Sequence, residues 1–462
     1  MIWAIDVLSR ETMLFAAVGF AIGGIDDLAI DLLYFIWLFC RLVGWRPKAP
    51  VVADFPIGED AGHIGVFVAA WDESAVIGAM LRTALARFDY PAYTIYVGAY
   101  PNDRPTIDAV AEVAAADPRV RLVIGTDHGP TTKAGCLNTI WRAMLRDEAA
   151  GAPVAKAVVL HDAEDVVHPA ELAIVDRLIE QHWEVQLPVL PLIDRRSRLV
   201  SGHYADEFAE AHVKQMVVRE FLGAGLPLAG VGCAIARPAL DLIAARRDGE
   251  PFDPTSLTED YELGLGIDAL GGRSTFARVA ERPGGPVVAV RAYFPATIEA
   301  AVRQKARWMI GIALAGWDRV GWGRFDDWRE HWMRMRDRRE PLAVLVLGVA
   351  YLALVAWAVS GLCHMIVPEP ALAVAPAMRM LLDVNAVLLA WRLVLRAGFT
   401  AGAYGWREAC WVPLRLLTAN VIALLAVRRA LLRYWAMLRG DGVRWDKTRH
   451  DFPADIVAAT ER

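Results

Sequence analysis

Three carboxylates stand close together at Asp162, Glu164 and Asp165, directly after the apolar run 157–160. The run has the aliphatic, β-branched composition of a buried strand. Three negative charges at the end of a buried strand are costly unless another group compensates them. Carboxylate oxygens suit Mg²⁺ or Mn²⁺, so one interpretation is a divalent cation bound to a diphosphate. The other interpretation is a solvated loop.

Two further stretches place charged side chains at predicted helix starts. Lys133 opens the sequence KAGCLN after the polar turn 128–132. A lysine at that position can meet a phosphate together with the amides of the helix N-terminus, although it can also be simply solvated. The sequence SLTEDYELG places Glu259 and Asp260 at another helix start. Carboxylates there often only cap the helix.

A predicted amphipathic helix over residues 297–317 carries Gln304, Arg307 and Trp308. Their spacing of i, i+3 and i+4 puts the three side chains on one helix face. Arginine and tryptophan there could hold a diphosphate and stack on a sugar or peptide group. The alternative is a surface helix that lies against a membrane.

Strands and helices alternate around these residues. Strands are predicted at 65–70, 94–99 and 120–124, and helices at 74–87 and 133–146, which indicates a parallel α/β sheet. Ligands bind such sheets beyond the carboxyl ends of the strands. Polar residues gather at that edge, namely Trp71, Asp72, Glu73, Asn102 and Asp103. The glycine pattern of dinucleotide-binding folds does not follow the first strand, which argues against a dehydrogenase.

Composition indicates a membrane protein. The 462 residues are 56% hydrophobic, the mean hydropathy is +0.31, and the excess lies at the two ends of the chain. The net charge of −5 gives no reason to expect a nucleic acid partner. The five cysteines are scattered and predict neither a zinc site nor a disulfide framework.

Several apolar segments are candidates for the membrane. Residues 13–43 are interrupted by two glycines and three aspartates, so we expect either one long or kinked spanning helix or a helix break at the interface. Arginines after this segment place the next domain in the cytoplasm. Segments 342–363 and 377–395 are predicted to span. Segment 410–427 fits an interfacial or re-entrant helix better than a third span.

These segments divide the chain into five parts. We expect an N-terminal membrane segment at 1–48, a cytoplasmic catalytic domain at 49–298, interfacial amphipathic helices at 299–340, C-terminal membrane helices at 341–440 and a cytoplasmic tail at 441–462.

The order of the motifs resembles one family. The chain resembles membrane-bound family 2 glycosyltransferases of the cellulose and hyaluronan synthase kind. The motifs that carry this resemblance are, in chain order, a carboxylate after the second strand, K-A-x-x-L-N, D-x-[DE], T-E-D and Q-x-x-R-W, and membrane helices flank them. The match is closer still to a bacterial inner-membrane subgroup linked to phage adsorption and exopolysaccharide. Stretches such as GIDDLAIDLLY, GPTTKAGCLN, LHDAEDV, DEFAE and YFPATIEAAVRQKARWMIGI carry it, from about residue 24 to 453.

The resemblance implies a GT-A fold and an inverting transfer from a nucleotide-diphospho-sugar, most simply a UDP-sugar. It assigns Asp260 as the general base beside Glu259, and Asp162, Glu164 and Asp165 as the Mg²⁺ or Mn²⁺ site, with Asp165 in support. Donor binding falls to Ala69, Trp71, Glu73, Asp103, Lys133, Asp162, Gln304, Arg307 and Trp308. The base near a metal-bound diphosphate is expected to depend on position as much as on proton affinity.

The resemblance also implies partners and leaves alternatives. The expected partners are a polysaccharide or lipid-linked acceptor, the inner membrane, which the chain crosses more than once, and an export partner. The usual Asn-Glu after the first strand is Asp72-Glu73 here, which weakens the uridine assignment. Asp206, Glu207 and Glu210 are either acceptor contacts or a solvated helix face. A single-transfer glycolipid enzyme and a catalytically idle membrane scaffold or receptor subunit are the competing functions.

Overall fold

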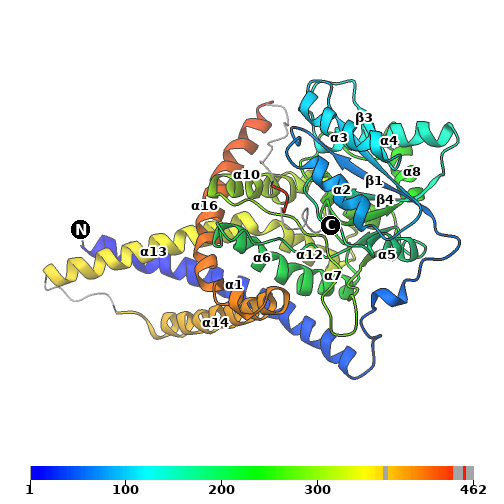
Figure 1. Cartoon of the computed structure of the whole chain (residues 1–462). Helices are drawn as coiled ribbons and strands as arrows, with labels where there is room; N and C mark the ends of the chain where they lie inside the picture. The colour runs from blue at the N-terminus through cyan, green and yellow to red at the C-terminus, as the bar shows by residue number, and fades with distance from the viewer. Residues whose placement is uncertain (1, 368–372, 441–450, 454–462) are drawn as a thin grey trace.

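The computed structural model describes residues 2–367, 373–440 and 451–453 of the chain. An α/β domain forms one side of the molecule, and the long helices α1, α13 and α14 project away from it (Figure 1). The tail residues Trp445, Lys447, Thr448 and His450, which match a family motif, lie outside the described residues.

One seven-stranded sheet, in the order β3-β2-β1-β4-β6-β5-β7, forms the centre of the α/β domain. The four strands β1 to β4 are parallel, whereas β6 runs antiparallel to β4 and β5. The predicted, mostly parallel sheet is therefore confirmed. The strands are β1 (His63–Ala69), β2 (Tyr93–Ala99), β3 (Val120–Ile124), β4 (Ala155–His161), β5 (Glu184–Gln186), β6 (Cys233–Ala236) and β7 (Ser274–Phe276).

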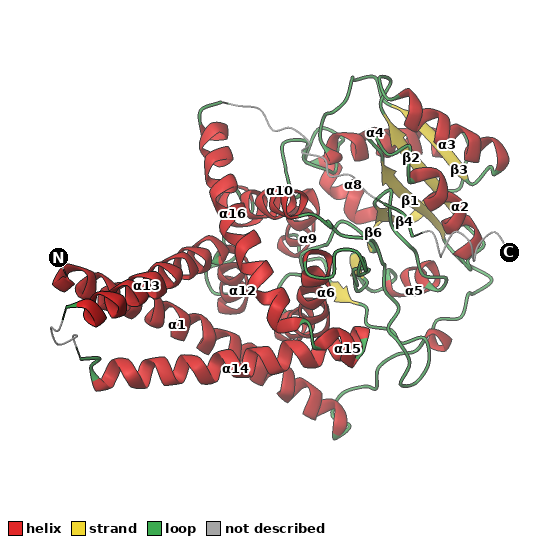
Figure 2. Cartoon of the chain, turned by 60° about the vertical axis from the view of Figure 1, so that its left-hand side comes forward, coloured by secondary structure: helices red, strands yellow, loops and turns green. Residues whose placement is uncertain are grey.

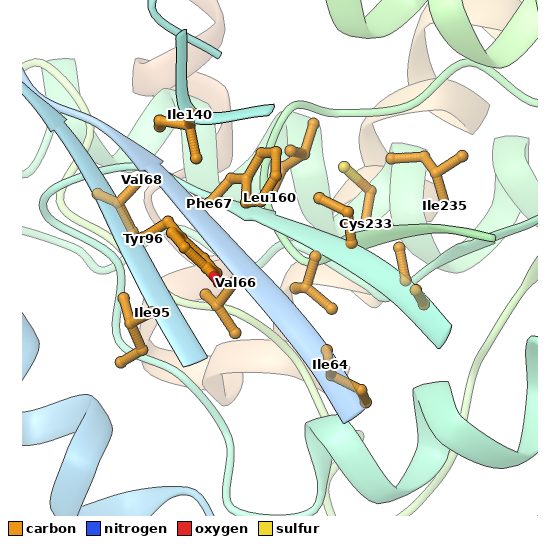
Figure 3. Packing of buried hydrophobic residues seen from close by; sticks show 14 of the residues in the cluster. Ile64, Val66, Phe67, Val68, Ile95, Tyr96, Ile140, Leu160, Cys233 and Ile235 are labelled. Carbon is orange, nitrogen blue, oxygen red and sulfur yellow. The ribbon is translucent and has the colours of Figure 1, made fainter. Parts of the chain in front are cut away.

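Helices connect the strands and pack on the sheet. They are α2 (Ile77–Arg87), α3 (Arg104–Ala116), α4 (Lys133–Ala149), α5 (Glu171–Leu178), α8 (Arg237–Ala245) and α9 (Glu259–Ala269), with a short 3-10 turn η1 (Val52–Asp54) before β1. Figure 3 shows how Phe67, Leu160 and Ile235 from three strands pack in the core. At Gly98 on β2, a Cβ would lie 2.6 Å from the Cys136 sulfur and 2.8 Å from Ile140. This glycine lets α4 approach the sheet, which brings the start of α4 to the ligand edge.

Two described helices, α1 (Ile2–Leu42) and α13 (Glu340–Ile366), are long and apolar enough to cross a membrane. They pack antiparallel, since Asp6 meets Ser360 and His364 at one end while Asp26 meets Arg339 at the other. The rise along α1 between Asp6 and Asp26 is about 30 Å, the thickness of a bilayer core.

The acidic residues of α1 do not break the helix. Of the two expected alternatives, the structure shows the single long helix, 41 residues without interruption, and not the break. Asp26 and Asp27 pair with Arg336 and Arg339 near the start of α13, and Asp31 accepts a hydrogen bond from Lys214 at 2.5 Å. These contacts compensate the charges, and α1 can therefore stay helical.

The remaining helices join the two parts. They are α6 (Val200–Glu210), the π-helical turn η2 (Ala211–Gln215), α7 (Met216–Leu222), α10 (Ile298–Trp308), the π-helical turn η3 (Met309–Leu314), α11 (Gly316–Arg319), α12 (Trp328–Arg338), α14 (Pro376–Tyr404), α15 (Trp406–Ala409) and α16 (Val412–Leu438). The stretch 297–317, predicted as one helix, is divided among α10, η3 and α11. Figure 2 shows α16 running steeply across the direction of α1 and α13.

Each carboxylate of α6 has a cationic partner; Asp206 and Glu210 are buried, whereas Glu207 stays partly exposed. Asp206 pairs with Arg415 of α16 at 3.0 Å, Glu207 with Lys305 of α10 at 2.5 Å, and Glu210 with Arg396 of α14 at 2.8 Å. The three acids of the DEFAE stretch thus fasten the α/β domain to three flanking helices, and their contact with an acceptor stays a prediction.

Candidate active site

A pocket opens at the carboxyl ends of β1 and β4. It gathers most of the predicted residues from five separate elements. Those that line it are Ala69, Glu73, Lys133, Asp162, Glu164, Asp165, Glu259, Asp260, Gln304, Arg307 and Trp308. Trp71 and Asp103 are not among its lining residues.

The acidic loop after β4 is held by a buried histidine. The backbone amide of Asp162 donates to Asp165 Oδ2 at 3.0 Å, and the same oxygen lies 2.8 Å from His161 Nδ1. The other ring nitrogen lies 2.9 Å from Glu171 Oε1. Burial alone would lower the pKa of His161, but Glu171 and Asp165 raise it to about 10. The protonated ring therefore fixes Asp165, which in turn supports the loop.

Lys133 begins α4 and points across the pocket. Thr132 caps the helix by accepting from the Gly135 amide at 3.2 Å. The Lys133 ammonium donates to Asp162 Oδ1 at 2.5 Å and to the Gly230 carbonyl at 3.2 Å. Burial alone would lower the pKa of this lysine, but Asp162, Glu259 and Asp260 raise it above its ordinary value. The lysine is therefore a permanent cation in the pocket.

Glu259 and Asp260 form the first turn of α9. Burial and the neighbouring Asp260 raise the pKa of Glu259 to about 7. Burial also raises the pKa of Asp260, although Lys133 opposes the shift. Proton affinity thus adds to position at this carboxylate, which suits a group that must accept a proton near neutral pH.

The opposite wall of the pocket is aromatic. Trp308 lies at the end of α10, with its ring centroid 6.3 Å from that of Phe208 on α6. Tyr293 and Phe294 complete this wall. Sequence reasoning did not assign Phe208, Tyr293 or Phe294 to the site, although they lie in the DEFAE and YFPAT stretches that carried the family resemblance. Apolar rings beside charged groups are common in pockets that bind sugars and nucleotides.

Two predicted donor contacts shape the pocket from outside. Asp103 accepts from the Asp72 amide at 2.5 Å and from the Thr106 amide at 3.4 Å, so it caps α3 and fixes the turn after β1. The Trp71 ring packs edge-on against Tyr100 with centroids 5.2 Å apart. Direct contact of these two residues with a nucleoside stays a prediction.

The oxygen donors at the sheet edge fit a hard divalent cation. Asp162 and Glu164 line the same part of the pocket. Within the described residues, no three acidic, histidine or cysteine side chains are already gathered as a metal site. A Mg²⁺ or Mn²⁺ ion at these two carboxylates would therefore need further oxygens, which a bound diphosphate offers.

Comparison with known proteins agrees with this geometry. Residues 61–311 match the family model described as glycosyltransferase like family 2. Bacteriophage adsorption protein B of Escherichia coli K12 and Bacteriophage N4 adsorption protein B of E. coli O157:H7 are each 33% identical to the chain over 98% of its length. The chain spans 64% of the length of these two relatives.

A solved structure has the same fold. The mannosyltransferase PcManGT from Pyrobaculum calidifontis, determined in complex with GDP-Man and Mn²⁺, is 19% identical with a TM-score of 0.56. The alignment covers 91% of this chain and 99% of that one. The likeness therefore extends beyond the sheet to the flanking helices.

Proposed function

Because the chain belongs to glycosyltransferase family 2 and has the GT-A fold, we propose that it transfers a sugar from a UDP-sugar, with inversion, to a growing exopolysaccharide. One observation carries this proposal: a single pocket holds a cation, a pair of sheet-edge carboxylates and a separate carboxylate with a raised pKa. Those are the groups that transfer from a diphosphate requires.

Each group has one task. Asp260 removes the proton from the acceptor hydroxyl as that oxygen attacks the sugar, which is the role of a general base in an inverting reaction. Lys133 and Arg307 stabilise the negative charge that develops on the leaving diphosphate. Mg²⁺ or Mn²⁺ held by Asp162 and Glu164 would neutralise the same charge as a Lewis acid. Trp308 and Phe208 give the sugar an apolar face to stack on.

We place the reaction at the cytoplasmic face of a bacterial inner membrane. The support is the charge at the domain end of the membrane helices, where Arg41 and Arg46 follow the apolar part of α1 and Arg336 and Arg339 precede α13. Positive residues accumulate on the cytoplasmic side of spanning helices. The α/β domain lies at that end in Figure 1.

Nucleotide release from membranes tests the proposal. Membranes that contain the chain are incubated with UDP-glucose, UDP-N-acetylglucosamine, UDP-galactose and GDP-mannose, each with Mn²⁺ or EDTA. We expect release of UDP from one UDP-sugar and loss of release with EDTA. GDP release alone would move the donor assignment to a guanine nucleotide, and no release from any donor would contradict the function.

A single-transfer glycolipid enzyme is the second candidate, and the small number of membrane helices favours it. Among the described helices, only α1 and α13 are long and apolar enough to span a membrane. Two spanning helices are few for a self-contained polysaccharide channel. Product size decides between the two. A ladder of lengthening products on a gel supports the polymer synthase, whereas one mono-glycosylated lipid supports the glycolipid enzyme.

A further inference from the structure

The Lys133 ammonium lies where two different partners need it. Its position at the start of α4 suits contact with a phosphate. In the structure, however, it donates at 2.5 Å to Asp162 Oδ1, one of the carboxylates that fit the metal. The Asp162 oxygen that now accepts from the ammonium is also an oxygen that a metal ion would take, so the lysine and a metal compete for this carboxylate.

The surroundings explain why the lysine pairs with Asp162. Lys133 keeps only 17% of its side chain exposed, and Glu259 is 8% exposed. The positive charge of the lysine acts on Asp162, Glu259 and Asp260 together. Gathered carboxylates repel one another when no cation is present. Lys133 therefore supplies the charge compensation that the pocket needs before it binds a ligand.

Gly230 holds the Lys133 ammonium through its backbone carbonyl. Its carbonyl accepts from Lys133 at 3.2 Å, and its φ of +73° favours glycine. A Cβ at this position would lie 2.6 Å from Asp260 Oδ2 and 3.4 Å from the Lys133 ammonium. The missing side chain thus leaves the space in which the lysine stands between Asp162 and Asp260.

We propose that Lys133 is the resident counter-ion of the metal site, and that it leaves Asp162 for the donor diphosphate when metal and donor bind together. The inference rests on the proposed function and adds an order of binding to it. A metal ion alone competes with a tethered ammonium and binds weakly. A metal ion with a nucleoside diphosphate does not, because the displaced ammonium gains a new anionic partner. Metal and nucleotide therefore strengthen each other's binding.

Mn²⁺ binding measured without turnover tests the proposal. The purified full-length chain in detergent is titrated with Mn²⁺, and the free ion is followed by electron paramagnetic resonance with and without UDP. For the wild-type chain, we expect UDP to tighten Mn²⁺ binding at least tenfold. For Lys133→Met, Mn²⁺ alone should bind at least tenfold more tightly than to wild type. The tightening by UDP should be smaller than in wild type, because the diphosphate still offers oxygens to the metal but no ammonium has to be displaced.

Three variants control for fold and charge. Lys133→Arg keeps the positive charge and should bind Mn²⁺ as weakly as wild type. Lys133→Gln repeats the Lys133→Met result with a polar side chain, in case the methionine variant does not fold. Lys156→Met removes a lysine that pairs with Asp176 at 2.7 Å outside the pocket, and it should leave Mn²⁺ binding unchanged.

The results separate this inference from the proposed function. Wild-type protein that binds Mn²⁺ equally well with and without UDP overturns the counter-ion role, and so do neutral Lys133 variants with no gain in Mn²⁺ affinity. If UDP-sugar turnover persists in those cases, the proposed function stands alone. If the neutral Lys133 variants gain tenfold in Mn²⁺ affinity but the wild-type chain turns over no nucleotide sugar, the counter-ion role is supported and the transferase function is contradicted.

Discussion

The acids of α6 and the acids of the pocket differ in how their charge is compensated. Each acid of α6 has a cation from a flanking helix within hydrogen-bond distance; the pairs are Asp206 with Arg415, Glu207 with Lys305, and Glu210 with Lys214 and Arg396. In the pocket, Lys133 contacts Asp162 and also acts on Glu259 and Asp260. The paired acids of α6 join parts of the fold, although burial still raises the pKa of Asp206 to about 6. The pocket acids Glu259 and Asp260 are acted on by Lys133 and Arg307, burial raises their pKa values, and they can exchange protons.

Removal of the base gives the largest expected effect. Asp260→Asn keeps the size of the side chain but cannot accept the acceptor proton, so kcat should fall by about 10²–10⁴-fold. Turnover is measured as nucleotide release, and Mn²⁺ binding in the presence of UDP serves as the control for an intact donor site. A variant that keeps most of its turnover would show that another group is the base.

Removal of a structural cation should cost stability and leave the chemistry alone. Arg415 is 1% exposed, and Arg415→Met leaves Asp206 buried without its cation. We expect a loss of about 3–5 kcal/mol in unfolding free energy, with kcat near that of wild type below the unfolding temperature.

Thermal unfolding in detergent measures the loss. The matched control is Arg407→Met on the neighbouring helix α15, where the arginine is exposed. An Arg415→Met chain with wild-type stability would contradict the contrast between the two sets of acids.

The pH dependence of turnover should report the protonation of Glu259 and Asp260. Burial raises the pKa of Asp260 above its ordinary value and raises that of Glu259 to about 7, so this neighbouring pair takes up a proton as the pH falls through about 7. Turnover should therefore rise with pH up to about 7 and fall about tenfold per unit below it. Initial rates between pH 5 and 9 measure this limb. A limb in the ordinary carboxyl range near pH 4 would mean that Lys133 dominates over burial.

The smallest effect is expected where a pair on α6 meets solvent. Glu207 keeps 40% of its side chain exposed, so water screens its attraction to Lys305. Lys305→Met should cost no more than about 1 kcal/mol of unfolding free energy. Chemical denaturation of this variant beside Arg415→Met shows whether burial sets the strength of the α6 pairs, and equal losses would refute that view.

The sequence was sufficient for the parts of the site that strand ends and helix starts position. Asp162 follows an apolar run, Lys133 opens a helix and Gln304, Arg307 and Trp308 share a helical period, and all five line one pocket. Local pattern and the parallel topology determine where such residues meet. The order of the motifs then added the family, which no single motif could.

The missed features depend on partners that are distant in the chain. Glu210 pairs with Arg396, 186 residues away, and nothing near either residue signals the pair. The acids of α1 suggested a break because their cations lie more than 180 positions further on. Asp103 caps α3 in the structure, and its contact with the donor stays a prediction, because a carboxylate after a strand fits a site and a helix cap equally well.

The unbroken α1 helix sets where the enzyme can find its acceptor. The helix α1 contacts α13 near its start, through Asp6 and His364. Near its end it contacts η2, through Asp31 and Lys214. Residues 43–62, between α1 and β1, form a loop with only the short turn η1, so side-chain contacts such as that of Asp31 with Lys214 hold the two parts together. Under the proposed function, an acceptor anchored in the lipid would reach the pocket by diffusion in two dimensions at a high effective concentration. A freely dissolved acceptor gains nothing from this geometry.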